Sequence, residues 1–431
     1  MKIIGIIAEY NPFHNGHAYQ INEIKKRTGA DYVVIALSGD FVQRGTPAII
    51  DKYARTKMAL SSGADLVIEL PALWATASAE DFAMAGVTLF DKMRCVDTLC
   101  FGAETDNLPL LSTLADILAD EPAKYQSLLS AYLKEGLVFP AARAKALCEF
   151  LNTDAVSSIL NEPNNILALE YLKALKRRSS SIQPYLLKRE GAGYHDTTLL
   201  TDTNAPAASA TAIREVLLGA DATFQSRIHN CEINEILNQS MPDTATDILL
   251  DYLRRRPMMQ ADDFSSILGY QLLNVSKETL AAVGGCNTDI ANRLFKNRTQ
   301  FSSFETFCEL NKSKDTTYTR ISRILLHLIL GISHEDYQRA KNLDYIPYLR
   351  ILGFRINASA ILKILKASAN VPLISKLANA SSLLSEDALW LLEKDIFAAD
   401  LYEQLCSVKL YEAHKKKTTS QSEYTREIVR I

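Results

Sequence analysis

Short runs of aliphatic and β-branched residues alternate with helix-periodic stretches through the first half of this 431-residue chain. Each run is apolar and bounded by Gly, Pro or Asp, which is typical of a buried strand. Strands and helices alternating at this spacing predict parallel strands joined by right-handed crossovers, the doubly wound α/β plan. The predicted strands are Lys2–Ala8, Asp31–Leu37, Asp65–Leu70, Asp97–Phe101 and Ile182–Lys188, and the predicted helices between them are Ala18–Arg27, Lys52–Ser61 and Ala79–Met93.

The rest of the chain is mainly helical in period. We predict a Rossmann-like α/β nucleotide-binding catalytic domain over residues 1–220, with a helical insertion at about 108–180. A mainly α-helical domain is predicted over residues 221–431, with one short strand at Cys406–Leu410 and a basic C-terminal tail at Lys415–Lys417. Its predicted helices are Thr244–Arg254, Phe264–Val275, Asp315–Gly331, Ala358–Lys366 and Glu386–Leu405.

Composition excludes several classes of protein. A formal net charge of −3 excludes a uniformly basic nucleic-acid binder, so any such surface must be local. No apolar run reaches the roughly 18 residues of a spanning helix, and the N-terminus lacks the pattern of a signal peptide. Seven cysteines without a CxxC pair or His/Cys ligand spacing argue for a reducing compartment and against a structural zinc site. We therefore expect a cytoplasmic protein with no membrane contact.

The loop after the first predicted strand, residues 9–17, is the most informative segment. Ligands of open α/β sheets bind at the carboxyl ends of the strands, where helix N-termini also point. His14 and His17 lie three residues apart, so on a helical turn they could aim two ring N–H donors at one phosphate. Gly16 leaves space for a nucleotide beside the backbone. Two surface histidines are the alternative, and a metal site lacks a third nearby ligand; the position after the strand favours the phosphate site.

His14-Asn15-Gly16-His17 resembles the HxGH signature of the nucleotidylyltransferases and class I aminoacyl-tRNA synthetases. The second signature of that superfamily, a Ser-x-Thr-x-Ile-Arg loop before a helix, resembles Ser209-Ala210-Thr211-Ala212-Ile213-Arg214. Hydroxyls at a helix start, with an arginine one turn on, would hold the β- and γ-phosphates. Alone, the hexapeptide could be a simple N-cap. Together and in this order, the two segments indicate an ATP site.

Further segments narrow the resemblance to the bacterial tRNA(Met) cytidine acetate ligase family. They are Gln43-Arg44-Gly45, Lys52-x-x-Arg55, residues 65–71, Phe101-Gly102, residues 163–167, Tyr318-Thr319-Arg320-Ile321-x-Arg323 and residues 346–353. The resemblance implies synthesis of N4-acetylcytidine at the wobble base of elongator tRNA(Met) from acetate and ATP, through acetyl-adenylate.

The site residues follow from the resemblance and from the chemistry. Acetate is already an anion at pH 7, so donors that offset the phosphate charge are the main requirement. His14 and His17 are therefore the expected catalytic pair. Lys52 and Arg55 are candidate pyrophosphate partners, with a solvated helix face as their alternative. The expected ATP-binding residues are Ile7, Ala8, Glu9, Tyr10, Asn11, Pro12, Phe13, His14, Asn15, Gly16, His17, Ala18, Tyr19, Gln20, Gly102, Asn164, Arg189, Glu190, Ser209, Thr211 and Arg214.

Two of these positions have structural alternatives: a turn glycine at Gly102 and an N-cap at Asn164. Mg²⁺ is expected with ATP, but no protein-built metal site is predicted.

Anticodon recognition needs cations with some aromatic side chains. Residues 293–323 contain seven Lys and Arg residues but only three Asp and Glu residues, which makes this segment locally basic. A solvated face is the alternative for any single cation. The candidate tRNA-binding residues are Arg293, Lys296, Arg298, Arg320 and Arg323.

Two other functions are compatible with the sequence. One is a small-molecule adenylyltransferase or carboxylate–amine ligase with the same first half, although such an enzyme has no evident need for a basic helical region. The other is an RNA-binding protein that has kept a nucleotide pocket without turnover. Elongator tRNA(Met) and acetate are the partners that the resemblance implies, and no protein partner is predicted.

Overall fold

The computed structural model describes residues 1–153, 155–189, 209–219, 231–414 and 420–431. Its centre is an eight-stranded sheet in the order β10-β8-β5-β2-β1-β6-β7, with β9 beside β8. The five strands from β5 to β7 in this order are mutually parallel. The chain therefore leaves the central strand first to one side and then to the other, which confirms the Rossmann-like prediction. These strands are β1 (Ile3–Ala8), β2 (Tyr32–Ser38), β5 (Leu66–Leu70), β6 (Thr98–Ala103) and β7 (Gln183–Lys188).

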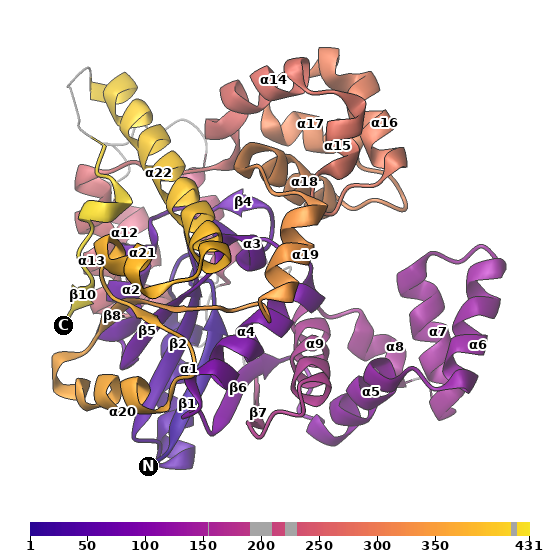
Figure 1. The fold of residues 1–431 in the computed structure, drawn as a ribbon, viewed down its shortest axis with the longest axis horizontal. Helices are drawn as coiled ribbons and strands as arrows, with labels where there is room; N and C mark the ends of the chain where they lie inside the picture. Colours follow the sequence, from indigo (N-terminus) through magenta and orange to yellow (C-terminus); the bar gives the residue numbers. More distant parts are fainter. Residues whose placement is uncertain (154, 190–208, 220–230, 415–419) are drawn as a thin grey trace.

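Helices cover both faces of this sheet (Figure 1). Because side chains alternate along a strand, Ile3 joins one hydrophobic core while Ile4 and Ile6 join the other. The packing against the first face is close: a Cβ added at Gly86 would lie 2.4 Å from Cδ1 of Ile7. The main covering helices are α4 (Ala79–Met93) and α9 (Pro163–Arg177) on the first face and α1 (Asn15–Thr28) and α2 (Lys52–Ser61) on the second.

Four helices between β6 and α9 form an arm at the side of the molecule (Figure 1). Helix α5 packs along α9, and α6 pairs with α7 at the far end of the arm. The four are α5 (Leu108–Asp120), α6 (Ala123–Lys134), α7 (Phe139–Leu151) and α8 (Ala155–Leu160).

The second half of the chain is mainly helical, as predicted, but it is not separate from the sheet. Strand β8 (Leu349–Phe354) pairs antiparallel with β5, so that Leu66 lies opposite Phe354. Strands β9 (Leu373–Ile374) and β10 (Val429–Arg430) both pair with β8 in parallel. The predicted division at residue 220 is therefore corrected, because three strands from beyond it complete the sheet.

The predicted strand at Cys406–Leu410 is wrong, because these residues lie inside the long helix α22 (Glu386–His414). The predicted tail at residues 415–417 lies outside the described residues. The other helices beyond residue 220 are α12 (Cys231–Ser240), α13 (Asp243–Arg255), α14 (Ser265–Asn274), α15 (Lys277–Ala282), α16 (Thr288–Asn297), α17 (Phe304–Asn311), α18 (Tyr318–Leu330), α19 (His334–Asn342), α20 (Ala360–Ser368) and α21 (Ala380–Leu383). Before residue 220 lie also α3 (Ala72–Ala75) and α10 (Ala210–Leu218).

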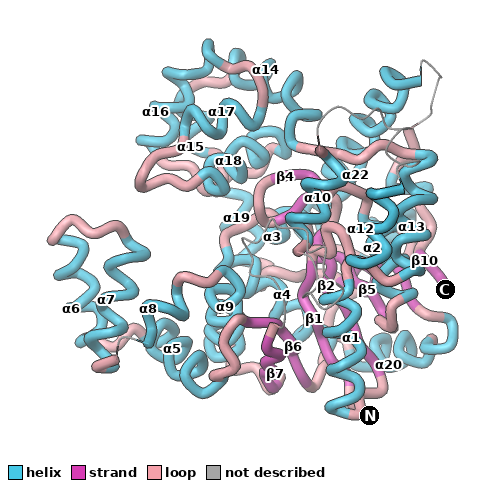
Figure 2. Tube along the Cα trace, turned by 180° about the vertical axis from the view of Figure 1, so that it is seen from behind, coloured by secondary structure: helices cyan, strands magenta, loops and turns pink. Residues whose placement is uncertain are grey.

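Helices α14 to α18 form a group beside a short hairpin that follows β2 (Figure 2). The hairpin consists of β3 (Phe41–Val42) and β4 (Thr46–Pro47). A Cβ added at Gly45 in its turn would lie 2.3 Å from the backbone nitrogen of Arg323 in α18, and the φ of Gly45 is +78°. The hairpin thus joins the α/β sheet to the helical group. Within the described residues, the helices are too short or too polar to cross a membrane.

Candidate active site

The loop after β1 is held in place by its own side chains and by its neighbours. Tyr10 and Phe13 are buried, and Oδ1 of Asn11 accepts a hydrogen bond from the Ile49 backbone N–H at 2.9 Å. The loop ends at His14, which is the N-cap of α1. The strand and the helix hold both ends of the loop, which therefore lies at the carboxyl edge of the sheet, as the sequence predicts.

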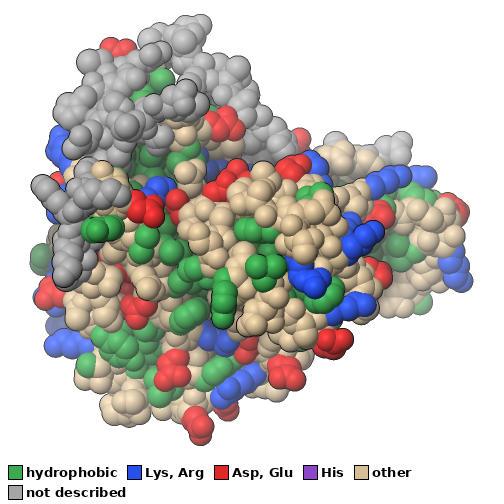
Figure 3. All heavy atoms as spheres, turned by 90° about the horizontal axis from the view of Figure 1, so that it is seen from above, with side chains coloured by type: hydrophobic (Ala, Val, Ile, Leu, Met, Phe, Trp, Pro, Cys, Tyr) green, Lys and Arg blue, Asp and Glu red, His purple; other side chains and the backbone are tan. Residues whose placement is uncertain are grey.

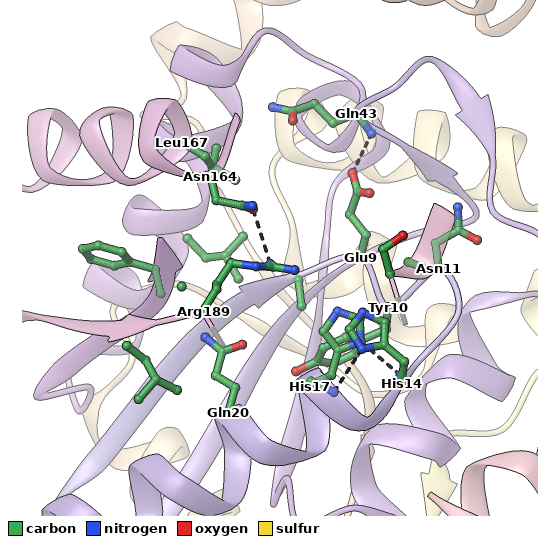
Figure 4. Close-up of a pocket in the computed structure, with 18 of the residues that line it drawn as sticks. Glu9, Tyr10, Asn11, His14, His17, Gln20, Gln43, Asn164, Leu167 and Arg189 are labelled. Atoms are coloured by element: carbon green, nitrogen blue, oxygen red, sulfur yellow. Dashed lines mark hydrogen bonds between the residues drawn. The ribbon is translucent and has the colours of Figure 1, made fainter. Parts of the chain in front are cut away.

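His14 and His17 form a stacked pair at this rim, with ring centroids 3.7 Å apart (Figure 4). Nδ1 of His14 accepts a hydrogen bond from Gly16 N–H at 3.1 Å, and Nδ1 of His17 accepts one from His14 N–H at 3.2 Å. A backbone N–H can only donate, so both Nδ1 atoms are unprotonated and each neutral ring carries its proton on Nε2. The capping pattern therefore fixes the tautomer and leaves two Nε2–H donors.

Electrostatics keep both rings neutral. Burial, together with the guanidinium groups of Arg189 and Arg214, lowers the pKa of His14 to about 3. Burial, with His14 and Arg189 nearby, also lowers the pKa of His17 well below its ordinary value. At neutral pH the pair consists of neutral hydrogen-bond donors, whereas the sequence had left their charge undefined.

The close approach of residues 14 and 16 explains the glycine between the histidines. A Cβ added at Gly16 would lie 2.9 Å from Cε1 of His14. The expectation that Gly16 makes room for a nucleotide is thus supplemented by a simpler reason: it makes room for the His14 ring.

The second predicted segment meets the first. Ser209 is the N-cap of α10, and its Oγ accepts a hydrogen bond from Ala212 N–H at 3.1 Å. Arg214 donates to the Asn11 carbonyl at 2.7 Å and to Oγ1 of Thr211 at 3.0 Å. The N-cap interpretation of this hexapeptide is therefore confirmed. Ser209, Thr211 and Arg214 also line the cavity at the histidines, and their phosphate contacts stay a prediction.

The opposite wall comes from β6, α9 and β7. Asn164 accepts a hydrogen bond from Arg189 at 3.4 Å (Figure 4). Its side chain also donates to the Glu104 carboxylate. Asn164 lies in the first turn of α9, whose N-cap is Glu162, so the N-cap alternative for Asn164 is wrong. A Cβ added at Gly102 would lie 3.2 Å from Cγ of Arg189, so this glycine gives room to the Arg189 side chain.

Most of the expected ATP-binding residues line this one cavity. Those that do are Ile7, Ala8, Glu9, Tyr10, Asn11, His14, Gly16, His17, Tyr19, Gln20, Gly102, Asn164, Arg189, Ser209, Thr211 and Arg214. Pro12, Phe13, Asn15 and Ala18 belong to the same loop and helix but not to the lining, and Asn15 instead donates to the Gln239 carbonyl at 2.8 Å. Glu190 lies outside the described residues.

Sequence reasoning missed nine further site residues, which are Gln43, Arg44, Phe82, Phe101, Leu167, Tyr171, Leu187, Lys188 and Ala210. Gln43 and Arg44 belong to one of the segments that carried the resemblance, as do Phe101 and Leu167, so their presence in those segments was the available clue. The apolar members could not be distinguished from core residues by pattern alone.

The predicted phosphate contacts of Lys52 and Arg55 are corrected. Both side chains are fully buried, so the solvated-face alternative is also wrong. Nζ of Lys52 lies 2.7 Å from Glu69 and 2.6 Å from Glu423. Arg55 donates to the carbonyls of Glu9, at 2.7 Å, Ser38 and Gly39. Arg55 thus holds the loops at the carboxyl ends of β1 and β2, whereas Lys52 links β5 to Glu423 near the C-terminus.

The predicted tRNA-binding cations lie in the helical group, but most of them contact protein. Arg293 donates to Thr316 at 3.1 Å, and the Arg298 guanidinium lies 3.6 Å from the Phe295 ring centroid. The half-buried Arg323 donates to the Gln43 carbonyl at 3.4 Å in the hairpin turn. Lys296 is exposed, and Arg320 donates to the Gly285 carbonyl at 3.5 Å.

On the face that contains the upper helices of Figure 1, Lys and Arg side chains lie among Asp and Glu side chains (Figure 3). A basic RNA surface on the described part of this face would therefore have to be local.

The charge of the cavity is strongly one-sided. Arg44, Lys188, Arg189 and Arg214 line it together with one carboxylate, Glu9, among the described residues. Searched over the described residues, the chain has no group of three or more His, Cys, Asp or Glu side chains that could hold a metal. An anionic ligand of extended shape fits this wall, with the two histidine donors at one point along it.

Comparison with known proteins agrees with this geometry. The family model described as HIGH Nucleotidyl Transferase matches residues 1–418. A tRNA(Met) cytidine acetate ligase of Thermoanaerobacter sp. (strain X514) is 39% identical over 403 residues, which cover 93% of this chain and 95% of that protein. The protein of the same name from Clostridium perfringens (strain ATCC 13124) is 38% identical over 415 residues, covering 94% and 96%.

Two solved structures share the fold over essentially the whole chain. The apo structure of Thermotoga maritima TmcAL has a TM-score of 0.89 at 28% identity and covers 100% of both chains. The structure of Thermotoga maritima TmcAL bound with alpha-thio ATP has a TM-score of 0.87 at 27% identity and covers 100% of this chain and 99% of the other.

Proposed function

The chain belongs to the HIGH nucleotidyl transferase family, among the tRNA(Met) cytidine acetate ligases, and from this we propose that it is an ATP-dependent ligase that acetylates a cytidine of tRNA(Met). The observation that carries the proposal is the cavity at the stacked histidines, with its four cations and two neutral Nε2–H donors. ATP is its proposed nucleotide, in keeping with the ATP analogue bound by the Thermotoga maritima relative.

In the proposed first step, an acetate oxygen attacks the α-phosphorus of ATP and pyrophosphate leaves, which gives acetyl-adenylate. The obstacle is repulsion between acetate and the triphosphate, because both are anions at pH 7. His14 and His17 are proposed to donate through Nε2 to the α-phosphate oxygens, where charge develops in the transition state. We propose that Arg214, Ser209 and Thr211 hold the other phosphates. Arg214 donates to the Asn11 carbonyl at 2.7 Å, which supports this role beside the histidine loop.

The other wall is proposed to hold the nucleoside. Asn164 and Arg189 are hydrogen-bonded to each other, so one amide and one guanidinium present a fixed polar edge to a ribose or base. Mg²⁺ is proposed to arrive with the triphosphate, because magnesium binds phosphate oxygens with one or two carboxylates and the described lining offers one. With tRNA and ATP as substrates, we propose a cytoplasmic location.

In the proposed second step, the exocyclic N4 amine of the wobble cytidine of elongator tRNA(Met) attacks the acetyl carbonyl and AMP leaves. This amine is conjugated with its ring and is a poor nucleophile, which is the chemical reason to activate acetate first. The helical group α14–α18, whose Arg323 contacts the Gln43 carbonyl of the hairpin turn, is the proposed RNA-binding region.

Incubation of the protein with labelled acetate and ATP, with and without tRNA, tests the proposal. We expect acetyl-AMP in both reactions and, in the reaction that contains tRNA, transfer of the labelled acetyl group to the tRNA. Acetyl-AMP without transfer would instead support a small-molecule adenylyltransferase or carboxylate–amine ligase. Absence of turnover with retained RNA binding would support an RNA-binding protein with an inert pocket.

Charge reversal tests the RNA-binding region separately. Lys296→Glu and Arg320→Glu should each weaken tRNA binding and reduce the salt slope of log K by about 1, the value expected for one lost phosphate contact. Acetyl-AMP synthesis should persist. Arg323→Glu is a poor probe of RNA, because Arg323 holds the hairpin turn through the Gln43 carbonyl. Unchanged tRNA affinity in both Lys296→Glu and Arg320→Glu would exclude these two side chains from the interface.

A further inference from the structure

Acetylation of the cytidine N4 amine must also dispose of a proton. The nitrogen gains a bond to the acetyl carbon and becomes a neutral amide only if it loses one hydrogen as H⁺. General bases at such a position contribute about 10² to 10⁴ in rate. A proton acceptor near the acyl group would therefore accelerate the proposed acetyl transfer, and this inference rests on that function.

The two histidines are unsuited to this task. Each uses its Nδ1 lone pair to accept a backbone N–H, at 3.1 Å for His14 and 3.2 Å for His17. The remaining nitrogen, Nε2, already carries the proton, so each ring can donate but cannot accept without breaking the helix cap. The histidines therefore serve the phosphate and leave the amine proton to another group.

The other lining groups narrow the choice. The four cations have no acceptor atom, and burial raises the pKa of the Tyr10 and Tyr171 phenols, which keeps them protonated. Glu9 is the carboxylate that remains among the described lining residues. Its backbone is fixed by Arg55, which donates to the Glu9 carbonyl at 2.7 Å.

The Glu9 side chain extends from the end of β1 toward Gln43, away from the stacked histidine rings (Figure 4). Its Oε1 accepts a hydrogen bond from Gln43 N–H at 2.8 Å, which leaves Oε2 available to a ligand in the cavity. Burial raises the pKa of Glu9, opposed by the Gln43 hydrogen bond and by the charges of Arg44, Arg214 and Arg55. A carboxylate with a raised pKa is a stronger base than one in water.

The turn that holds Glu9 faces the helical group. Ser322 of α18 donates to the Gly45 carbonyl at 2.9 Å, and Arg323 donates to the Gln43 carbonyl. The same turn carries an unused donor: Nε2 of Gln43 is buried and lacks a hydrogen-bond partner within the described part of the chain. The Glu9 carboxylate and the Gln43 amide thus lie at the turn that contacts the helical group, which is the proposed RNA-binding region.

We propose that Glu9 is the general base of acetyl transfer and that Glu9 and Gln43 together form the cytosine subsite. Cytosine presents the N4 amine, a donor, beside the acceptors N3 and O2, and a carboxylate is a partner that accepts from N4. The N4–C bond forms as the bond between the acetyl carbon and the phosphate oxygen breaks. AMP leaves with that electron pair, and the N4 proton passes to the Glu9 carboxylate. Uridine, with O4 in place of the amine, would set one acceptor against another.

The test separates the two half-reactions in the full-length protein. Hydroxylamine traps acetyl-adenylate as acetohydroxamate without tRNA, and a single-turnover assay measures acetylation of tRNA. In Glu9→Gln, which keeps an oxygen for the Gln43 N–H but cannot take a proton, tRNA acetylation should fall about 10² to 10⁴-fold. Acetohydroxamate formation should fall about tenfold or less, the effect of one altered hydrogen bond.

Two further variants complete the test: one changes the second residue of the proposed subsite, and the other is a control elsewhere in the cavity. Gln43→Met removes the unpartnered amide donor at similar side-chain length, and should raise the KM for tRNA about tenfold with less effect on kcat. Gln20→Met alters the cavity near β6, where Gln20 contacts Cys100, and should lower both half-reactions together. Matching thermal unfolding midpoints for the three variants would show that the differences arise in the site.

Three outcomes would overturn the proposal. In Glu9→Gln, these outcomes are an equal loss of both half-reactions, or tRNA acetylation within tenfold of the unmodified protein. In Gln20→Met, the outcome is a selective loss of acetyl transfer as large as that in Glu9→Gln. Failure of the proposed function gives a different result, since the unmodified protein would then form acetohydroxamate without acetylating tRNA.

Discussion

Charged residues are concentrated in two regions of this protein, and the two regions differ in their balance of cations and carboxylates. The cavity at the carboxyl edge of the sheet has four cations and one carboxylate among its described lining residues. The α2 ion cluster, which consists of Lys52, Glu69, Arg350 and Glu423, has two cations and two carboxylates packed against one another. An excess of one charge around a cavity attracts a ligand of opposite sign, whereas a buried, balanced cluster is satisfied by the protein itself.

The difference shows how motif residues should be interpreted. Lys52, Arg55 and Arg350 lie in segments that carried the family resemblance, as do the cavity residues His14 and His17. Burial and the Arg350 guanidinium act to lower the pKa of Lys52, but the carboxylates of Glu423, Glu69 and Asp40 outweigh them and hold that pKa above its ordinary value. The groups that a motif cation contacts therefore decide whether it binds a ligand or stabilises the fold.

The largest effect should come from breaking the α2 ion cluster. Lys52→Met leaves Glu69 and Glu423 buried without their shared cation, which should lower the free energy of unfolding by about 3–5 kcal/mol. Lys176→Met removes a surface cation that lies 2.7 Å from Asp120, and should cost at most about 1 kcal/mol. Urea denaturation of both variants measures the difference, and equal losses would mean that burial of the cluster adds nothing.

Replacing a histidine of the cavity should affect catalysis rather than stability. His17→Ala and His14→Asn, the latter retaining a side-chain acceptor for the cap, should each reduce acetate-dependent ATP–pyrophosphate exchange about 10² to 10³-fold, the usual cost of one such donor. tRNA binding should survive. His334→Ala, where the ring contacts the Cys286 carbonyl at 2.9 Å in the helical region, is the matched control and should retain exchange. Loss of tRNA binding in parallel would point to misfolding.

The hairpin turn borders the cavity. Like the α2 ion cluster, however, it is held by contacts within the protein. Gly45→Ala should destabilise the protein by about 3 kcal/mol, because its φ of +78° is strained for alanine and its Cβ would meet the α18 backbone. Gly29→Ala also has a positive φ but would meet nothing within 4 Å, and should cost about 1 kcal/mol. If the two variants unfold at the same urea concentration, the hairpin does not pack against α18 as described.

Acid should affect the two regions in different pH windows. The pKa of His14 is lowered from 6.5 to about 3, so its contribution to stability is complete above pH 6.5 and is lost as pH falls toward 3. Lys52 and Arg350 overcome burial and lower the pKa of Glu423 from 4.5 to about 2, so its contribution is lost only below pH 4.5.

Denaturation at a series of pH values separates these contributions. Between pH 6.5 and 5.5, His14→Asn should lose roughly 1 kcal/mol less stability than the unmodified protein, because one proton changes stability by about 1.4 kcal/mol per pH unit. Glu423→Gln should match the unmodified protein in this window and differ from it below pH 4.5. An identical pH slope for all three proteins above pH 4.5 would contradict the assignment of this window to His14.

The elements that sequence predicted correctly depend on neighbours in the chain. The five parallel strands follow from short apolar runs and crossover spacing, and the HxGH loop follows from its place after β1. Elements formed by distant pairing were missed. Strand β8 is recognisable only beside β5, where Leu66 meets Phe354, and residues 406–410 extend a helix that their apolar pattern did not distinguish from a strand.

The sequence alone determined the order of strands and helices, the loop that carries the two histidines and the family to which the chain belongs, because these depend on residues close together in the chain. Tertiary structure decided which partner each charged side chain has. Lys52 pairs with Glu423, more than 350 residues away in the chain, while Arg214 donates to a carbonyl of the loop after β1. It also decided the protonation of the histidines, since burial and two backbone N–H groups set their charge and tautomer. Local pattern cannot encode such contacts, because the energy of a buried charge depends on the groups that the fold brings to it.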